Sequence, residues 1–402
     1  MQRTSLVTLS LGILATGTSR AETLTADADF PGGNIIVERI EEEDIHVRQD
    51  LRDTAGYWFY WCFRVRGGAG RRITVHFADG GVIGVRGPAM SMDGGLTWTW
   101  LGADAVQGKG FSHQIPAGQN DVRFSFGMPY TQTNLGSFLR RHTGNPHLQA
   151  GTLCQTRAGR DVELLHLGQL AGTPDHRVLL SCRHHCCEMM ASYALEGIMD
   201  TILSDNEDGA WLREHVAFLV VPFADKDGVE QGDQGKNRKP RDHNRDYDGE
   251  SVYAATAALR KLVPEWGGDR LHFAMDMHCP HIRGSSNEVV YFVGMADPAL
   301  WANTQAFSTI LEATNTGLLP YRKQDNLPYG QGWNVAKNYG AGMSCSRWAG
   351  TLPGIRFAAS LEIPYANAGG VAVTQESAHA FGRALAHAIR RFLNESPPTS
   401  EP

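Results

Sequence analysis

This 402-residue sequence has no basic cluster with interleaved aromatic residues and, after its first residues, no long apolar run. It has 37 Lys and Arg against 43 Asp and Glu, a net charge of −6 and a pI near 6.2, and no Lys/Arg cluster is interleaved with aromatic residues. Nucleic acids and anionic membranes call for basic patches, so neither is expected as a partner. After the first residues no apolar run is long enough for a membrane span, and no oligomeric state is indicated.

The cysteines do not indicate a disulfide framework either. The chain has seven cysteines, and because this number is odd, paired disulfides would leave one thiol over. The cysteines therefore do not identify the compartment. Core material is plentiful: 42% of the residues are hydrophobic and 20% are charged, which is typical of a folded soluble protein with two ordinary domains or one large one.

The first residues resemble a short secretory signal. Residues 1–22 contain an early Arg3, an apolar stretch from Leu6 to Ala15, and a polar segment ending at Ala21. We therefore expect a signal peptide over residues 1–22 and export to the periplasm or the medium. A cytoplasmic location is the alternative.

Residues 23–132 consist of short alternating runs separated by glycine pairs such as Gly67-Gly68 and Gly80-Gly81. Strands at this spacing predict an N-terminal all-β sandwich domain. The aromatic run from Tyr57 to Phe63 suggests either a ligand-stacking platform or core, and we favour core. The predicted strands are 35–39, 45–48, 57–66, 73–77 and 122–126.

Beyond Asp161 apolar strands alternate with helices. This alternation predicts an α/β domain over residues 133–395, with a mixed, largely parallel sheet flanked by helices. Sites in such sheets gather at the carboxyl ends of the strands. Residues 396–402 are polar and rich in proline, so we expect a flexible tail. The predicted strands are 178–182, 216–222, 271–277, 289–293 and 355–363, and the helices are about 189–204, 251–262, 298–314 and 376–392.

A His-x-x-Glu pair, His185 and Glu188, lies where the strand 178–182 gives way to a helix. An imidazole and a carboxylate at this spacing can point at one cation, but a catalytic zinc takes three protein ligands, so a third must come from elsewhere. A surface His and Glu opening a helix is the alternative. Cysteine ligation is not favoured, because the spacing of the four nearby cysteines matches no zinc-ribbon pattern; they are Cys182, Cys186, Cys187 and Cys279.

Polar residues follow the other strands of the second half as well. Asp227 to Arg245 follows the strand 216–222, and His278 to His281 follows the strand 271–277. Glu362 lies inside the apolar run of the last strand, where an unpaired buried carboxylate would be costly, so a nearby cation or an activated water is expected beside it.

With these elements in order, the sequence resembles the zinc carboxypeptidase family, and most closely the cytosolic carboxypeptidases and their bacterial relatives, which place a β-sandwich before the catalytic domain. The resemblance covers residues 133–393, more loosely the sandwich. Its motifs are His185-x-x-Glu188, Asp227-Gly228, Asn244-Arg245, Asp276-x-His278 and Glu362.

The resemblance implies one Zn²⁺ ion held by His185, Glu188 and His278, the two-histidine, one-glutamate set known for carboxypeptidase A. It implies that Asp242 orients the first ligand histidine and that Glu362 is the general base for the attacking water. For the substrate it implies that Arg238 holds the oxyanion and that Asn244 and Arg245 bind the terminal carboxylate.

Two further residues are implied by the same resemblance. Arg347 corresponds to the base of the side-chain pocket, which suggests a preference for a C-terminal Glu or Asp; the alternative is a surface arginine on a loop. Tyr339 corresponds to the mobile tyrosine that caps the substrate. The extra histidines His243 and His281 are interpreted as solvated or supporting residues. The family usually has Pro-Gly where this chain has Cys186-Cys187.

The hypothesis is therefore a zinc-dependent metallocarboxypeptidase that hydrolyses the C-terminal peptide bond of a peptide or protein, with preference for an acidic residue. One alternative is a peptidoglycan stem-peptide peptidase or deacylase on the same scaffold. The other is a zinc-keeping binding module without turnover, against which Glu362 and Arg238 speak, because a binder needs no general base.

Overall fold

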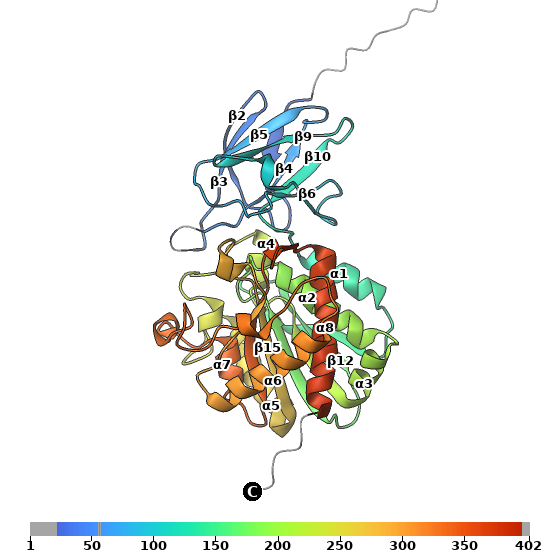
Figure 1. Cartoon of the computed structure of the whole chain (residues 1–402). Coiled ribbons are helices and arrows are strands. Elements are labelled where there is room, and N and C mark those ends of the chain that lie inside the picture. Colours follow the sequence, from blue (N-terminus) through green and yellow to red (C-terminus); the bar gives the residue numbers. More distant parts are fainter. Residues whose placement is uncertain (1–21, 55, 57, 396–402) are drawn as a thin grey trace, which may run out of the picture.

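The structure is a computed structural model that describes residues 22–54, 56 and 58–395 (Figure 1). Figure 1 shows two parts, a β-rich N-terminal part and a larger α/β part with its sheet between helices. The predicted tail, 396–402, and the predicted signal, 1–22 apart from Glu22, lie outside the described residues. No helix in the described ranges combines the length and hydropathy that crossing a bilayer requires.

The N-terminal part is a sandwich of two five-stranded sheets, with orders β1-β4-β10-β6-β7 and β2-β3-β5-β9-β8. Alternation fixes the inner faces: in β5, Ile73, Val75 and Phe77 are buried and the residues between them are not. The strands are β1 Thr25–Asp27, β2 Ile36–Glu41, β3 Asp44–Arg48, β4 Cys62–Arg66, β5 Arg72–Phe77, β6 Ala89–Ser91, β7 Thr99–Trp100, β8 Val106–Gln107, β9 Gly110–Gln114 and β10 Asp121–Ser125.

The strand predicted at 57–66 begins only at Cys62. Phe59 and Tyr60 precede this strand and contact the α/β part: the Phe59 ring lies 5.6 Å from the ring of Tyr365, and the Tyr60 amide donates to Gln234 Oε1 at 2.9 Å. Trp61 is fully buried. The described part of the aromatic run is therefore core, as predicted, and it joins the two parts in one continuous hydrophobic cluster.

The α/β part is built on a seven-stranded sheet of order β11-β12-β14-β13-β15-β17-β16. β13, β14, β15 and β17 are mutually parallel, and the outer strands are antiparallel to their neighbours. The predicted fold class is confirmed. The strands are β11 Leu148–Gln155, β12 Asp161–Gly168, β13 His176–Cys182, β14 Val216–Val221, β15 Leu271–His278, β16 Tyr291–Val293 and β17 Phe357–Glu362, with a small pair β18 Asn367–Ala368 and β19 Val371–Ala372.

Helices cover both faces of this sheet, so its strands are apolar on both sides. In β13, Val178 and Leu180 join the cluster under α2, α6 and α8, whereas Leu179 joins the cluster under α5 and α7. The helices are α1 Gln132–Arg141, α2 Met190–Leu203, α3 Glu207–His215, α4 Lys226–Gln231, α5 Ala254–Gly267, α6 Pro298–Thr314, α7 Cys345–Ala349 and α8 Gln375–Glu395. We keep 23–132 and 133–395 as proposed domain boundaries.

The parallel strands bring the predicted motifs to one edge. His278 is the last residue of β15, Glu362 is the last residue of β17, and their Cα atoms are register partners. His185 follows β13, and the long segment 222–245 follows β14. All four strands end at the same edge, so residues far apart in the sequence meet there.

Candidate metal centre and substrate cavity

Three side chains converge as the sequence predicted. Glu188 Oε1 lies 2.8 Å from His185 Nδ1 and Glu188 Oε2 lies 2.7 Å from His278 Nδ1, and the three side chains are at most 6% exposed. One donor atom from each lies within 4.8 Å of the others. Burial alone would raise the pKa of Glu188, but the two imidazoles hold it well below its usual range.

The Nε2 atom of each of these two histidines lies beside a carboxylate. His185 Nε2 lies 3.2 Å from both carboxylate oxygens of Asp242, as predicted, and His278 Nε2 lies 2.6 Å from Asp276 Oδ2. A histidine whose Nε2–H is donated outwards presents the Nδ1 lone pair inwards. Two inward Nδ1 lone pairs and one buried carboxylate make a donor set that fits zinc, with room left for a fourth ligand.

A cavity of about 250 Å³ opens beside this cluster. Glu362 lines it and is 7% exposed. Burial raises the pKa of Glu362; the neighbouring Glu188 raises it further, whereas His278 and Lys236 oppose the shift. A buried carboxylate beside a metal site, open to a cavity, is placed to accept a proton from a water held there.

The predicted carboxylate-binding residues also reach the cavity. Asn244 is fixed on both sides, because its Oδ1 accepts from the Cys345 amide at 2.9 Å and its Nδ2 lies 3.1 Å from His278 Nε2. Arg245 lines the cavity with its guanidinium tied to the carbonyl of Asn244 at 2.7 Å. Tyr339 lines the same cavity, and its hydroxyl donates to Asn334 Oδ1 at 2.8 Å. The structure thus brings all three to one place.

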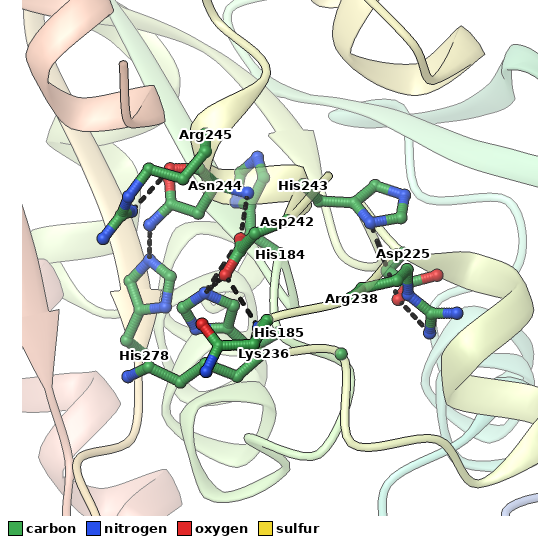
Figure 2. Close-up of polar contacts among 12 residues, drawn as sticks. His184, His185, Asp225, Lys236, Arg238, Asp242, His243, Asn244, Arg245 and His278 are labelled. Carbon is green, nitrogen blue, oxygen red and sulfur yellow. Dashed lines mark hydrogen bonds and ion pairs between the residues drawn. The ribbon is translucent and has the colours of Figure 1, made fainter. Parts of the chain in front are cut away.

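Arg238 is not brought to this cavity. Its guanidinium is 2.6 Å from Asp225, 3.0 Å from Asp233 and 3.7 Å from Asp53. It lines a separate cavity of about 170 Å³ with Asp225 and His243. Figure 2 shows Arg238 and Asp225 together, on the far side of Asp242 from His278. The predicted oxyanion role of Arg238 is therefore corrected, because three carboxylates hold its charge away from the metal ligands.

Arg347 also lies outside the cavity wall. It is half-buried in α7, and its guanidinium lies 3.6 Å from the ring centroid of Tyr339 and 5.0 Å from that of Tyr329. One guanidinium nitrogen, Nη2, is buried without a hydrogen-bond partner. The structure therefore places Arg347 against Tyr339 and not at the base of the cavity.

Sequence reasoning missed two residues of the site. His184 is fully buried, with Nδ1 2.7 Å from Asp276 Oδ1 and Nε2 2.7 Å from the Tyr247 hydroxyl, so it supports the carboxylate behind His278. Its position next to His185 in the sequence was the available signal. Lys236 lines the cavity with Glu362, His185 and His278. From the sequence, the cation of this loop is assigned to Arg238, two residues away, so Lys236 is not selected.

The cysteines are not ligands in the described part of the chain. All seven are free, and none belongs to a group of side chains that could hold a metal. Cys186 donates to the carbonyl of Asp233 at 3.0 Å, and Cys187 Sγ lies 3.1 Å from Gln234 Nε2. The Cys-Cys pair therefore packs the ligand loop against the segment that carries Lys236.

Two histidines and a glutamate at the carboxyl edge of a parallel sheet, with a buried glutamate in the adjoining cavity, form the kind of site that can hold one catalytic metal ion. Residues 140–261 match the zinc carboxypeptidase family profile. Residues 140–261 thus match a domain of a family that uses one zinc ion, and the resemblance predicted from the sequence is confirmed over this segment.

Curated relatives match part of the chain. Cytosolic carboxypeptidase 2 of Macaca fascicularis is 34% identical over 143 residues, which cover 33% of this chain and 17% of that protein. Cytosolic carboxypeptidase 3 of Mus musculus is 31% identical over 159 residues, 38% of this chain and 14% of that protein. The chain thus spans less than a fifth of the length of these relatives.

Solved structures match nearly the whole chain. A metallo-carboxypeptidase from Burkholderia cenocepacia has a TM-score of 0.76 at 20% identity, covering 93% of this chain and 99% of that one. A metallo-carboxypeptidase from Pseudomonas aeruginosa, in complex with (2-guanidinoethylmercapto)succinic acid, has a TM-score of 0.70 at 20% identity and covers 92% and 99%. At this identity the likeness establishes the fold, and the coverage includes the N-terminal sheets.

Proposed function

We propose that this chain is a zinc-dependent carboxypeptidase that removes the C-terminal residue of a peptide or protein, and that it prefers an acidic residue. The observation that carries the proposal is the meeting of His185, Glu188 and His278 with Glu362 and Arg245 at one cavity. Zinc, when bound by the first three, polarises the scissile carbonyl and lowers the pKa of water.

The chain's own residues supply the remaining requirements of peptide hydrolysis. Glu362 takes a proton from the attacking water and returns it to the leaving amine, a role for which its burial and its place at the end of β17 suit it. Arg245 and Asn244 bind the terminal carboxylate, since a planar guanidinium offers two parallel donors. Tyr339 closes over the bound residue from the cavity wall.

The acidic preference is supported by unpaired positive charge. Lys236 and Arg245 line the cavity, and within the described residues neither forms an ion pair with a carboxylate. Arg347 stacks on Tyr339, so a displacement of this ring on substrate binding would open a third cation to the substrate side chain. A Glu or Asp side chain would meet complementary charge there.

The test is release of the terminal amino acid from peptides ending in Glu, Asp, Leu, Lys and diaminopimelate, with zinc-loaded wild type beside Glu362→Gln. We expect acidic ends to be cleaved fastest, amidated peptides to resist, and Glu362→Gln to keep its zinc while kcat falls by about 10²- to 10⁴-fold. Preferred release of diaminopimelate would support the stem-peptide alternative. Release of acyl groups with no peptide cleavage would support a deacylase, and zinc binding without any turnover would support a binding module.

A further inference from the structure

The cation that faces the reacting groups is a lysine. Lys236 lines the cavity together with His185, His278 and Glu362, and its ammonium group has no hydrogen bond or ion pair within the described ranges. Figure 2 draws this ammonium on the side of His278 and His185, whereas Arg238 lies across the view beside Asp225. A half-buried ammonium without a partner is available to a ligand.

The backbone around Lys236 is fixed against the metal ligands. Gly235 has a φ of +82°, and a Cβ there would lie 2.5 Å from the Cys186 amide nitrogen and 3.1 Å from the His185 Cα. Only glycine tolerates this conformation together with this close approach. The backbone at Gly235 thus packs directly against the loop that carries His185. The side chain of the next residue, Lys236, therefore begins close to the predicted metal ligands.

The N-terminal sandwich holds the same segment from the other side. The Asp53 carboxylate accepts from the amide of Gln234 at 3.2 Å and from that of Gly235 at 2.8 Å. The Thr54 hydroxyl donates to the carbonyl of Lys236 at 2.7 Å. Asp53 and Thr54 are each 9% exposed, and they belong to the connection between β3 and β4. The two residues before Lys236 and the carbonyl of Lys236 itself are therefore hydrogen-bonded to the sandwich.

We propose that Lys236 binds the oxygen of the scissile carbonyl during attack, and that Asp53 and Thr54 of the sandwich are positioning residues for it. The inference rests on the proposed function. It assigns to the N-terminal part a share in the active centre, since two of its side chains set where the cation stands.

The step is an ordinary addition and elimination. The water oxygen bonds to the carbonyl carbon, the π electron pair moves onto the carbonyl oxygen, and Glu362 accepts the proton that the water loses. Lys236 keeps its proton and donates a hydrogen bond to the charged oxygen, which strengthens as the charge develops. The electron pair then re-forms the carbonyl, the C–N bond breaks with its electrons on nitrogen, and Glu362 returns the proton to the amine.

The first experiment compares zinc-loaded wild type with Lys236→Met and Lys236→Arg. We expect Lys236→Met to lower kcat by about 10²- to 10³-fold with KM changed less than about 3-fold, since one oxyanion donor is lost, and Lys236→Arg to recover at least about 10-fold of it. Zinc content and thermal midpoint should stay at wild-type values. Calorimetry with a peptide phosphonate that ends in leucine, which mimics the oxyanion, should show weakened binding in Lys236→Met, with binding of free leucine unchanged.

The second experiment addresses the sandwich. Thr54→Val should lower kcat by about 5- to 10-fold, while Thr54→Ser, which keeps the hydroxyl, should match wild type. In the Lys236→Met background Thr54→Val should have no further effect on kcat, because a positioning residue acts only through the group it positions.

The outcomes separate the two claims. If the wild type cleaves peptides and Lys236→Met keeps its kcat and its phosphonate affinity within about 3-fold, the Lys236 assignment is overturned and the proposed function stands. Additive losses in the double variant would overturn the positioning role of Thr54. If the wild type cleaves nothing, the proposed function fails, and phosphonate binding by the zinc-loaded protein still decides whether Lys236 meets an oxyanion.

Discussion

The segment that follows α4 carries cations on two sides, and in the described part of the chain only the cations on one side have carboxylate partners. On one side Lys236 and Arg245 line the substrate cavity with no carboxylate partner among the described residues. On the other side Arg238 lies among Asp53, Asp225 and Asp233, all three buried. Figure 2 shows both sides in one view.

The partners of a buried cation indicate whether it serves stability or substrate binding. A guanidinium that is surrounded by carboxylates has its hydrogen-bonding capacity used inside the protein, and removing it would leave buried negative charge unpaired. A cation left unpaired at a cavity has that capacity free for a ligand. Arg238 therefore stabilises the segment, and Lys236, Arg245 and the half-buried Arg347 are left for substrate.

The largest effect should come from Arg238→Met, which removes the shared partner of three acids. We expect the free energy of unfolding to fall by about 3 to 5 kcal/mol, because breaking a buried ion pair leaves uncompensated charge. Urea unfolding of the zinc-loaded protein measures it. Arg322→Met, at an exposed ion pair with Asp325, is the matched control and should cost less than about 1 kcal/mol. A stable Arg238→Met that loses turnover as completely as Lys236→Met would mean that Arg238 acts in catalysis and not in stability.

A smaller effect is expected from Arg347→Ala on substrate choice. Losing a charge-assisted contact should lower kcat/KM for peptides ending in Glu or Asp by about 10- to 100-fold, while peptides ending in Leu are cleaved as before. The ratio of the two kcat/KM values is measured by competition between a peptide ending in Glu and one ending in Leu, with Arg322→Ala as the control variant. An equal loss on both kinds of peptide would mean that Arg347 only supports the ring of Tyr339, on which it stacks.

The smallest effect concerns pH. Burial and the neighbouring Asp53 raise the pKa of Asp233 to about 6, although Arg238 and Arg52 oppose the shift. A carboxyl with a raised pKa stabilises the fold while protonated, so this contribution is present below about pH 4 and is lost as the pH rises through about 6. Relative to wild type, Asp233→Asn should therefore gain about 1 to 2 kcal/mol between pH 4.5 and pH 7 in urea unfolding. Parallel stability curves would contradict the assignment.

The sequence predicted what depends on pattern and order. Helix 298–314 was predicted with the bounds of α6, and the predicted strand ends place His185, His278 and Glu362 at one edge of the sheet. β11 and β12 were not predicted, although they form one side of the sheet. β11 is mostly exposed and has little apolar pattern to detect.

What the sequence could not decide was the direction of side chains in the loop after β14. Lys236 and Arg238 are two residues apart, and only the contacts of Gly235 and the three acids around Arg238 determine which of them faces the cavity. Arg347 illustrates the same limit, because its ring partner Tyr339 lies in a different short helix. Loop geometry depends on distant partners that a spacing argument does not contain.

The continuous core that joins the sandwich to the α/β part restricts how this chain can vary by recombination. Phe59 and Phe126 of the N-terminal part pack on Tyr365, which follows β17 by three residues and so belongs to the neighbourhood of Glu362. A sandwich exchanged as a module from another protein would have to reproduce those rings and the Asp53 contact together. The two parts are therefore expected to be inherited as a pair and to change in step with one another.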